Sequence, residues 1–303
     1  MQRRIEANWQ HHLISAILKG QFMISPEFAV GLGPQLEGIL KSTGIYENNF
    51  QLLERIDVMA YDEDGGEHDA EDIDEEGSKV IVLPVKGTML KYGTLCSYGM
   101  VEIAHYIKHF ASKENVSAIV LDIDSGGGAV NAVPPILEAI QFVKSMGKPI
   151  VAHCDAACSA AYWTASACDH IFSNNDVSSV FGSIGVMLSF LDMVPFYEKQ
   201  GARFHEVYSN HSSDKNLAFQ NLLKGEYDQI RKEMLDPMAV KFQDSVRSNR
   251  SPMIKLDTPG ILSGATYHGQ DSVNLGLADQ VGTLAAAIDY ASVQSWKKST
   301  VNT

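Results

Sequence analysis

The sequence predicts an α/β fold in which helices flank a parallel β-sheet. Three short apolar runs, Val80–Val85, Ala118–Ile123 and Pro149–Ala152, are typical of strands that are buried on both faces. Two segments with helical periodicity, Tyr98–Ala111 and Val133–Ser145, lie between these runs. Strands that alternate with helices form parallel sheets, and such sheets bind their ligands at the carboxyl ends of the strands. We therefore expect the functional residues in the segments that follow the predicted strands.

A helical extension and an acidic linker are predicted before this domain. Residues 1–60 contain helical patterns, such as His12–Leu18 and Pro34–Ser42, but no motif that indicates a function. The run Asp62–Gly77 is rich in acidic residues and contains glycines. Like charges repel one another and bury little apolar area, so this run predicts a disordered linker over residues 61–78. An acidic docking or metal-binding segment is the alternative.

The main domain is predicted to span residues 79–290, followed by a polar tail over residues 291–303 that is expected to be frayed from Gln294. Pro237 is expected to kink or divide the helix in which it lies, because proline lacks a backbone donor. The other elements expected after the first strands are a helix at Phe190–Gln200, a strand at Phe204–Tyr208, a long helix at Gly225–Ser248, a turn and short helix at Leu262–Leu277 and a strand at Ala278–Val281.

Composition and charge exclude several classes of protein. The formal net charge of -13 over 303 residues, without a basic run, argues against nucleic-acid binding. No stretch has the ~18 uninterrupted apolar residues of a membrane span, and the basic N-terminus lacks the apolar region of a secretory signal. The four cysteines have no second ligand pair, so we expect reduced core thiols, no metal and a cytoplasmic protein.

Ser159 is the first candidate catalytic residue. It lies in Cys154–Asp169, where small residues surround it, and Tyr162, Ala165 and Ser166 follow at helical spacing. This pattern predicts a strand-to-helix turn, at which a serine hydroxyl lies near the free N–H groups of a helix N-terminus. A serine that only caps the helix is the alternative.

Two glycine-rich segments are predicted at the same edge of the sheet. Gly126–Gly128 directly follows a predicted strand, and Val180–Val186 holds Ser183 between glycines. Each segment is explained either by a tight turn with positive φ or by a close backbone approach to a ligand. The spacing matches neither a P-loop nor a dinucleotide-binding loop.

A nucleophilic serine needs a base within about 3 Å, and two kinds of base are compatible with the sequence. A Ser-Lys dyad needs a lysine that burial keeps neutral, so that its pKa falls from about 10.4 to near 7. Lys215 follows a predicted strand and is a candidate, although Asp214 beside it would favour the charged amine. A Ser-His-Asp triad would use one of four histidines, namely His170, His205, His211 or His268.

Six ordered segments resemble peptidase family S49, which includes signal peptide peptidase A and the phage head-maturation proteases typified by the lambda protein C, within the ClpP/crotonase superfamily. The resemblance runs from about Val80 to Ile288. The six segments are V-I-V-L-P-V-K-G-T-M, L-D-I-D-S-G-G-G-A-V, C-S-A-A-Y-W-T-A-S-A, F-G-S-I-G-V-M, the stretch from Tyr197 to Lys215, and S-G-A-T-Y-H-G-Q-D-S-V-N-L-G-L-A-D-Q-V-G.

The resemblance implies a ClpP/crotonase-like parallel sheet domain and a role for each matched residue. Ser159 would be the nucleophile and Lys215 the general base. The backbone N–H groups of Gly127 and Ala160 would form the oxyanion hole. The substrate would lie against three further residues, Gly126, Gly128 and Ser183. This chain departs from the family pattern at Gly126, where the family has proline, and at Ala160-Ala161, where it has Gly-Gly. The loop Ser209–Lys215, which we call the lysine loop, is about two residues longer than is usual in the family.

The resemblance further implies a serine endopeptidase with no cofactor, acting in phage head maturation in the host cytoplasm or the prohead. Its partners would be protein or peptide substrates, such as scaffold and capsid or portal precursors, and further copies of itself in a ring-like homo-oligomer. No nucleic acid and no membrane span are expected. Two alternatives remain open at this point: a catalytically silent module that binds assembly proteins, and a crotonase-type acyl-CoA enzyme that uses Gly126–Gly128 as its oxyanion hole.

Overall fold

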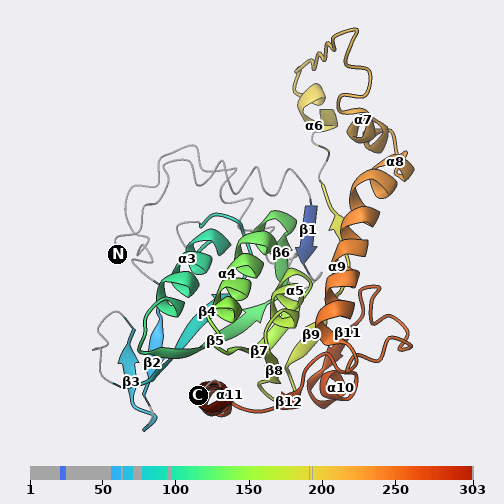
Figure 1. The fold of residues 1–303 in the computed structure, drawn as a ribbon. Helices are drawn as coiled ribbons and strands as arrows, with labels where there is room; N and C mark the ends of the chain where they lie inside the picture. The colour runs from blue at the N-terminus through green and yellow to red at the C-terminus, as the bar shows by residue number, and fades with distance from the viewer. Residues whose placement is uncertain are drawn as a thin grey trace.

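A largely parallel β-sheet with helices on both faces forms the centre of the molecule (Figure 1). The predicted α/β class is therefore confirmed. The computed structural model describes residues 21–24, 56–62, 64–70, 77–93, 97–190, 192 and 194–301. The helices predicted at His12–Leu18 and Pro34–Ser42 lie outside these residues.

The middle of the sheet consists of the parallel strands β4 (Lys79–Lys86), β5 (Val116–Ser125) and β7 (Ile150–Cys158). Each contains one of the predicted apolar runs, and β7 continues beyond the predicted end to Cys158. Parallel strands buried on both faces need such continuous apolar runs, which explains why the sequence signal is clear here.

Shorter strands extend the sheet on both sides. Along β7, β8 pairs with its first part and β9 with its last part, both in parallel. The antiparallel strands lie at the two edges. The shorter strands are β2 (Met59–Tyr61), β3 (Glu67–Asp69), β8 (His170–Ser173), β9 (Val180–Gly182), β11 (Thr266–His268) and β12 (Gln280–Val281).

Helices bury both faces of the sheet. The helices α3 (Met100–Ala111), α4 (Val133–Ser145) and α5 (Ala160–Ser166) pack on one face in a large apolar core. Helix α11 (Leu284–Val301) covers the other face in a smaller core (Figure 1). Among the helices of the described part of the chain, none is long and apolar enough to cross a bilayer.

Part of the acidic run is ordered, which corrects the prediction of a disordered linker. Strand β3 lies within this run and pairs with β2, and β2 in turn pairs with β4. Ala70 behind the hairpin is buried. Backbone pairing to the central sheet stabilises this segment in spite of its charge. The division into domains at residues 61–78 stays a prediction, and residues 71–76 lie outside the described part.

The long helix predicted at Gly225–Ser248 is divided, as expected from Pro237. It consists of α8 (Asp228–Ile230), a π-helical turn η2 (Arg231–Leu235) and α9 (Asp236–Arg250). Pro237 lies in the first turn of α9, directly after the π-helical turn. The wide turn directly before it absorbs the interruption of the helical hydrogen bonds.

Two helices and their loops project from the domain together with α8, and we call this part the arm (Figure 1). Helix α6 (Val194–Lys199) is shorter than predicted, and α7 (Leu217–Leu223) follows the predicted lysine loop. The strand predicted at Phe204–Tyr208 is wrong, because among the described residues no strand lies beside this largely exposed segment to pair with it. Alternating apolar residues predict a strand only where a sheet is available.

The C-terminal segment agrees with the sequence until its end. The predicted turn, helix and strand correspond to β11, α10 (Gly269–Asn274) and β12. The fraying expected from Gln294 is wrong for most of its length, because α11 continues to Val301. Apolar residues in the first half of α11, such as Ala287 and Ala291, are buried against the sheet and stabilise the helix.

A second, three-stranded sheet lies beside the carboxyl ends of the central strands. Its order is β10 (Met187–Leu188), β1 (Gln21–Ile24) and β6 (Gly127–Ala129), all antiparallel. Figure 1 shows β1 between the domain and the base of the arm. No pattern in the sequence predicts a strand at Gln21–Ile24.

A buried ion pair connects α9 to the C-terminal segment. The Arg250 guanidinium donates to both carboxylate oxygens of Asp279, at 3.1 and 2.8 Å, and its Nε donates to the Gly276 carbonyl at 3.0 Å. The Asp279 carboxylate also accepts from the Ile171 N–H at 2.7 Å. Because Arg250 is only 2% exposed, water cannot replace these bonds.

We predict that Asp279→Ala lowers the free energy of unfolding by about 3–5 kcal/mol, because it leaves a buried guanidinium without its partner. The matched control is Asp244→Ala, which removes an exposed carboxylate 2.7 Å from Arg247 and should cost at most about 1 kcal/mol. Urea unfolding of both variants measures the difference. Equal losses would contradict the special role of the buried pair.

His170 predicts a pH dependence of stability. Burial lowers the pKa of its imidazole, and Arg250 acts in the same direction, whereas Asp279 at 3.6 Å acts against them. Since the unfolded state then binds a proton at higher pH than the folded state, stability falls as the pH decreases below about 6.5. We expect His170→Phe to flatten this fall in urea unfolding between pH 7.5 and 5.5, and the exposed control His205→Gln to leave it unchanged.

Candidate active site

The carboxyl ends of β5, β7 and β9 bring three predicted site segments together. Ser125 at the end of β5 pairs with Ala157 of β7, and Gly182 at the end of β9 pairs with Cys158. The glycine loop that follows Ser125, the turn at Ser159 and the segment that begins with Ser183 therefore lie side by side. This is the edge of the sheet at which the sequence predicts the site.

Ser159 occupies a strained turn between β7 and α5. Its φ of 56° and ψ of -119° are unusual for a residue with a side chain. Its N–H donates to the Gly182 carbonyl at 2.8 Å, and its carbonyl accepts from the Trp163 N–H at 2.9 Å. These two bonds stabilise the strained conformation. Strained residues of this kind are found most often at functional sites.

The hydroxyl of Ser159 does not cap α5, so the N-cap interpretation is not supported. The first N–H of the helix that bonds back to the turn is that of Trp163. The N–H groups of Ala160 and Ala161 precede it and have no partner within the helix, as in every first helical turn. The side chains of both alanines are fully buried in the core, which explains why the sequence has only small residues here.

The glycine loop is held against Met89. The Met89 N–H donates to the Gly127 carbonyl at 2.9 Å, and the Met89 carbonyl accepts from the Ala129 N–H at 2.8 Å. A Cβ atom on Gly128 would lie 2.0 Å from the Met89 carbonyl oxygen, so only glycine fits. Gly127 adopts a φ of 101°, which also requires glycine. Both interpretations of the loop, a tight turn and a close backbone approach, are thus compatible with its geometry.

The Ser125 hydroxyl is hydrogen-bonded to the Gly127 N–H, the backbone donor that the resemblance assigns to the oxyanion hole. This hydroxyl accepts from the Gly127 N–H at 3.1 Å and donates to the Gly87 carbonyl at 2.5 Å. Ser125 is fully buried. Sequence analysis missed this residue, although its position directly before three glycines in the matched motif is a usable signal. A substrate carbonyl would have to compete with Ser125 for this N–H.

Ser183 lies on the other side of the Ser159 turn. It has a positive φ of 52°, and its N–H donates to the Ala265 carbonyl at 2.9 Å. A Cβ atom on the preceding Gly182 would lie 2.5 Å from the same carbonyl oxygen. The requirement for glycine at this position therefore comes from the close approach of the 260–265 loop.

Lys215 is not brought to Ser159. It lies in a turn of the arm directly before α7, and its side chain is exposed. Among the contacts of the described residues, no hydrogen bond or ion pair connects it to the Ser159 turn. The expected burial of this lysine is therefore not observed in the single chain, because the arm projects beyond the core (Figure 1).

No hydrogen bond or ion pair among the described residues joins any of the four candidate histidines to the Ser159 turn. His170 packs on Tyr290 and Phe172 at the amino end of β8, away from Ser159. The remaining three, His205, His211 and His268, are exposed.

A buried His-Asp pair that the sequence analysis missed lies on the opposite face of the sheet. His153 Nδ1 is 3.0 Å from Asp122 Oδ1, and Lys86 Nζ is 2.7 Å from Asp122 Oδ2. Successive residues of β5 and β7 point to opposite faces of the sheet. Asp122 and His153 lie on the face that α11 covers, opposite the face on which α5 packs. The pair therefore stabilises the far face and is not a base for Ser159.

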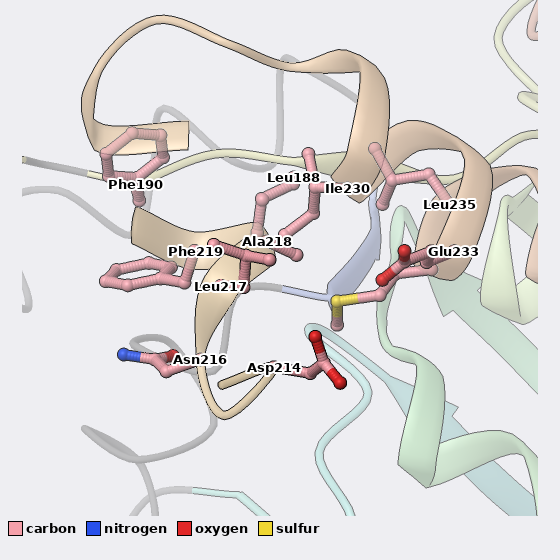
Figure 2. Close-up of a pocket in the computed structure, with 11 residues that line it drawn as sticks. Leu188, Phe190, Asp214, Asn216, Leu217, Ala218, Phe219, Ile230, Glu233 and Leu235 are labelled. Carbon is pink, nitrogen blue, oxygen red and sulfur yellow. The ribbon is translucent and has the colours of Figure 1, made fainter. Parts of the chain in front are cut away.

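A pocket lies between the arm and β10 (Figure 2). It has a volume of about 280 Å³, and Leu188 of β10 lines it together with apolar residues of α7, Ile230 and Leu235. Asp214 and Asn216, the neighbours of Lys215 in the chain, also line it (Figure 2). The lysine loop thus lies next to the small sheet that contains β6.

The chemistry of the site is that of a serine and backbone donors. Within the described ranges, no group of three His, Cys, Asp or Glu side chains is suited to hold a metal ion. Cys154, Cys158 and Cys168 are buried free thiols, and burial raises the pKa of Cys168 to about 12. Burial also raises the pKa of Cys154, so the thiolates of Cys154 and Cys168 are disfavoured and these two thiols are not nucleophiles. Cys96 lies outside the described residues.

Comparison with known proteins identifies the family. The model of "Peptidase family S49" matches residues 143–298, which is more than half of the chain. This chain belongs to peptidase family S49. The match covers four of the six segments, including the turn at Ser159 and the segment with Ser183, so the resemblance to family S49 is confirmed.

Named relatives of this S49 member include proteases of bacteria and phages. Protease 4 of Haemophilus influenzae is 26% identical over 71% of this chain and 34% of its own length. Head-tail preconnector protein GP5 of Enterobacteria phage P21 is 27% identical over 91% of this chain and 56% of its own. Capsid assembly protease C of Escherichia phage lambda is 29% identical over 69% of this chain and 48% of its own. The chain thus spans between a third and just over half of the length of these relatives.

We predict that Gly128→Ala disrupts the glycine loop, because its methyl group would meet the Met89 carbonyl. The free energy of unfolding should fall by about 1–3 kcal/mol, the usual cost of overpacking. Gly185→Ala is the matched control from the same edge of the sheet, since its nearest neighbour is 4.0 Å away. Urea unfolding that shows equal losses in both variants would contradict the close approach.

Proposed function

We propose that this S49 member is a serine endopeptidase in which Ser159 is the nucleophile. The observation that carries the proposal is the strained turn at Ser159, which lies between the Gly126–Gly128 loop and Ser183 and leaves its hydroxyl uninvolved in helix capping. An acyl-transfer site needs such an uncommitted hydroxyl beside backbone donors. The membership in a peptidase family supports the same chemistry.

In the proposed reaction, the Ser159 hydroxyl attacks the carbonyl carbon of the peptide bond and transfers its proton to the amine of Lys215. The N–H groups of Gly127 and Ala160 stabilise the developing oxyanion, and Gly126, Gly128 and Ser183 line the substrate. The protonated lysine then gives its proton to the leaving amine, and water hydrolyses the acyl-enzyme. Each oxyanion donor of this kind contributes about 3–4 kcal/mol to the transition state.

The dyad requires two changes from the single chain. Lys215 must leave water and approach Ser159, and the Gly127 N–H must exchange Ser125 for the substrate carbonyl. Assembly of a ring-like homo-oligomer would supply the first change, since packing of the arm against another copy would bury its exposed segments. The substrate itself would supply the second.

We propose cleavage of scaffold and capsid or portal precursors during phage head maturation as the biological role. The support is the similarity to two phage proteins, the head-tail preconnector protein GP5 and the capsid assembly protease C. A catalytically silent assembly module is the second candidate. The exposure of Lys215 and the bond between Ser125 and the Gly127 N–H favour it.

We predict that a fluorophosphonate probe labels Ser159 in the wild-type chain and does not label Ser159→Ala. Lys215→Met should reduce peptide hydrolysis at least ~10³-fold, because the serine loses its base. The matched control is Lys224→Met, another exposed lysine of the arm, which should stay within about twofold of the wild type, as should His211→Ala, an exposed histidine.

Labelling and hydrolysis are measured by intact mass and by release of fluorescent peptides from labelled casein. Full activity of Lys215→Met with loss of activity in His211→Ala would replace the dyad by a triad. A wild-type chain that neither reacts with the probe nor cleaves casein in any assembled state would favour the silent module.

A further inference from the structure

Strand β1 lies between two strands, β6 and β10, that do not pair with each other and that we call the walls. On one side Phe22, Met23 and Ile24 pair with Ala129, Gly128 and Gly127 of β6. On the other side Gln21 and Phe22 pair with Leu188 and Met187 of β10. The order β10-β1-β6 means that β6 and β10 have no direct pairing, so β1 fills a gap one strand wide. Such a gap between two strand edges accepts any extended peptide through its backbone.

Both walls of this slot begin at the proposed nucleophile. Strand β6 starts at Gly127, two residues after Ser125, whose partner on β7 is Ala157. Strand β10 follows the segment that begins with Ser183, directly after the Gly182 carbonyl that accepts the Ser159 N–H. A strand in the slot therefore runs towards the Ser159 turn.

The direction of β1 determines which end lies nearest to the turn. Because β1 is antiparallel to β6, its last residue, Ile24, lies opposite Gly127, and its first residues lie further along the slot. A peptide bound in the same direction would place its residues before the scissile bond at the positions of Gln21–Ile24. Its next carbonyl would lie beside Gly127 and Ser159.

We propose that Gln21–Ile24 is a built-in competitor that occupies the substrate slot of this chain. The inference rests on the proposed function and adds a regulation to it: the site is closed to an extended peptide until the segment is displaced. A segment attached to the same chain competes intramolecularly, so a free peptide competes poorly with it when the concentration of the peptide is below the effective concentration of the segment. The apparent affinity for substrate equals the intrinsic affinity multiplied by the fraction of chains that have an open slot.

The test uses the full chain with the double substitution Phe22→Pro and Met23→Pro. In a strand paired on both sides, the N–H groups of consecutive residues point to opposite neighbours, so two prolines remove a donor towards each wall. We expect hydrolysis of fluorescein-labelled casein to rise at least about fivefold, since a larger fraction of chains has an open slot. The matched control is Phe22→Ala and Met23→Ala, which keeps both N–H groups and should raise hydrolysis less.

A second measurement adds the segment back to the double proline variant as a free peptide. The synthetic peptide Gly-Gln-Phe-Met-Ile-Ser-Pro, which copies residues 20–26, should inhibit the double proline variant, and a copy methylated on the two backbone amides of Phe and Met should not. The fluorophosphonate reaction of Ser159 is recorded for every variant.

The outcomes separate the two proposals. If Ser159 reacts and casein is cleaved equally by wild type and double proline variant, and the peptide does not inhibit, the competitor is overturned while the peptidase stands. If no variant reacts or cleaves, the peptidase itself is overturned. A rise in hydrolysis that the peptide reverses supports the competitor.

Discussion

The close approach of three backbones at the carboxyl ends of β5, β7 and β9 is the constraint on which the site depends. The carbonyl of Gly182 accepts from the N–H of Ser159, whose backbone conformation is strained. The carbonyls of Met89 and Ala265 occupy the space that a Cβ atom on Gly128 or Gly182 would need. These contacts allow only glycine or small residues around the serine. They also hold its conformation without using its hydroxyl.

The same constraint explains why the core on this side is so uniform. Helix α5 begins directly at the strained turn and is buried along its whole length, with Trp163 stacked on Phe242 of α9 at 4.7 Å. The ion pair between Arg250 and Asp279 then connects the end of α9 to the β8–β12 part of the sheet. Rigid packing thus surrounds the serine on the core side, whereas the parts that would complete its chemistry lie on the solvent side.

Those solvent-side parts are the arm and β1, and both are joined to the domain through the small sheet. β10 leads into the arm that carries Lys215, and β6 carries the predicted oxyanion donor, with β1 between them. The proposed base, the predicted backbone donor and the proposed substrate slot are therefore all connected to the same three strands. Replacing β1 by another peptide in the slot would change the pairing of both β6 and β10.

The sequence by itself determined the class of the fold, the order of its central elements and the turn at Ser159. Buried parallel strands need continuous apolar runs, and a close backbone approach needs glycine or alanine, so both leave local signals, as at Val80–Val85 and Gly126–Gly128. Only the tertiary structure decided that β1 pairs with β6 and β10, that Ser125 accepts from the Gly127 N–H, and that Lys215 is exposed. These features depend on contacts between residues far apart in the chain, which local periodicity does not encode. For the same reason the alternation at Phe204–Tyr208 predicted a strand, although none of the strands that the structure describes lies beside this segment.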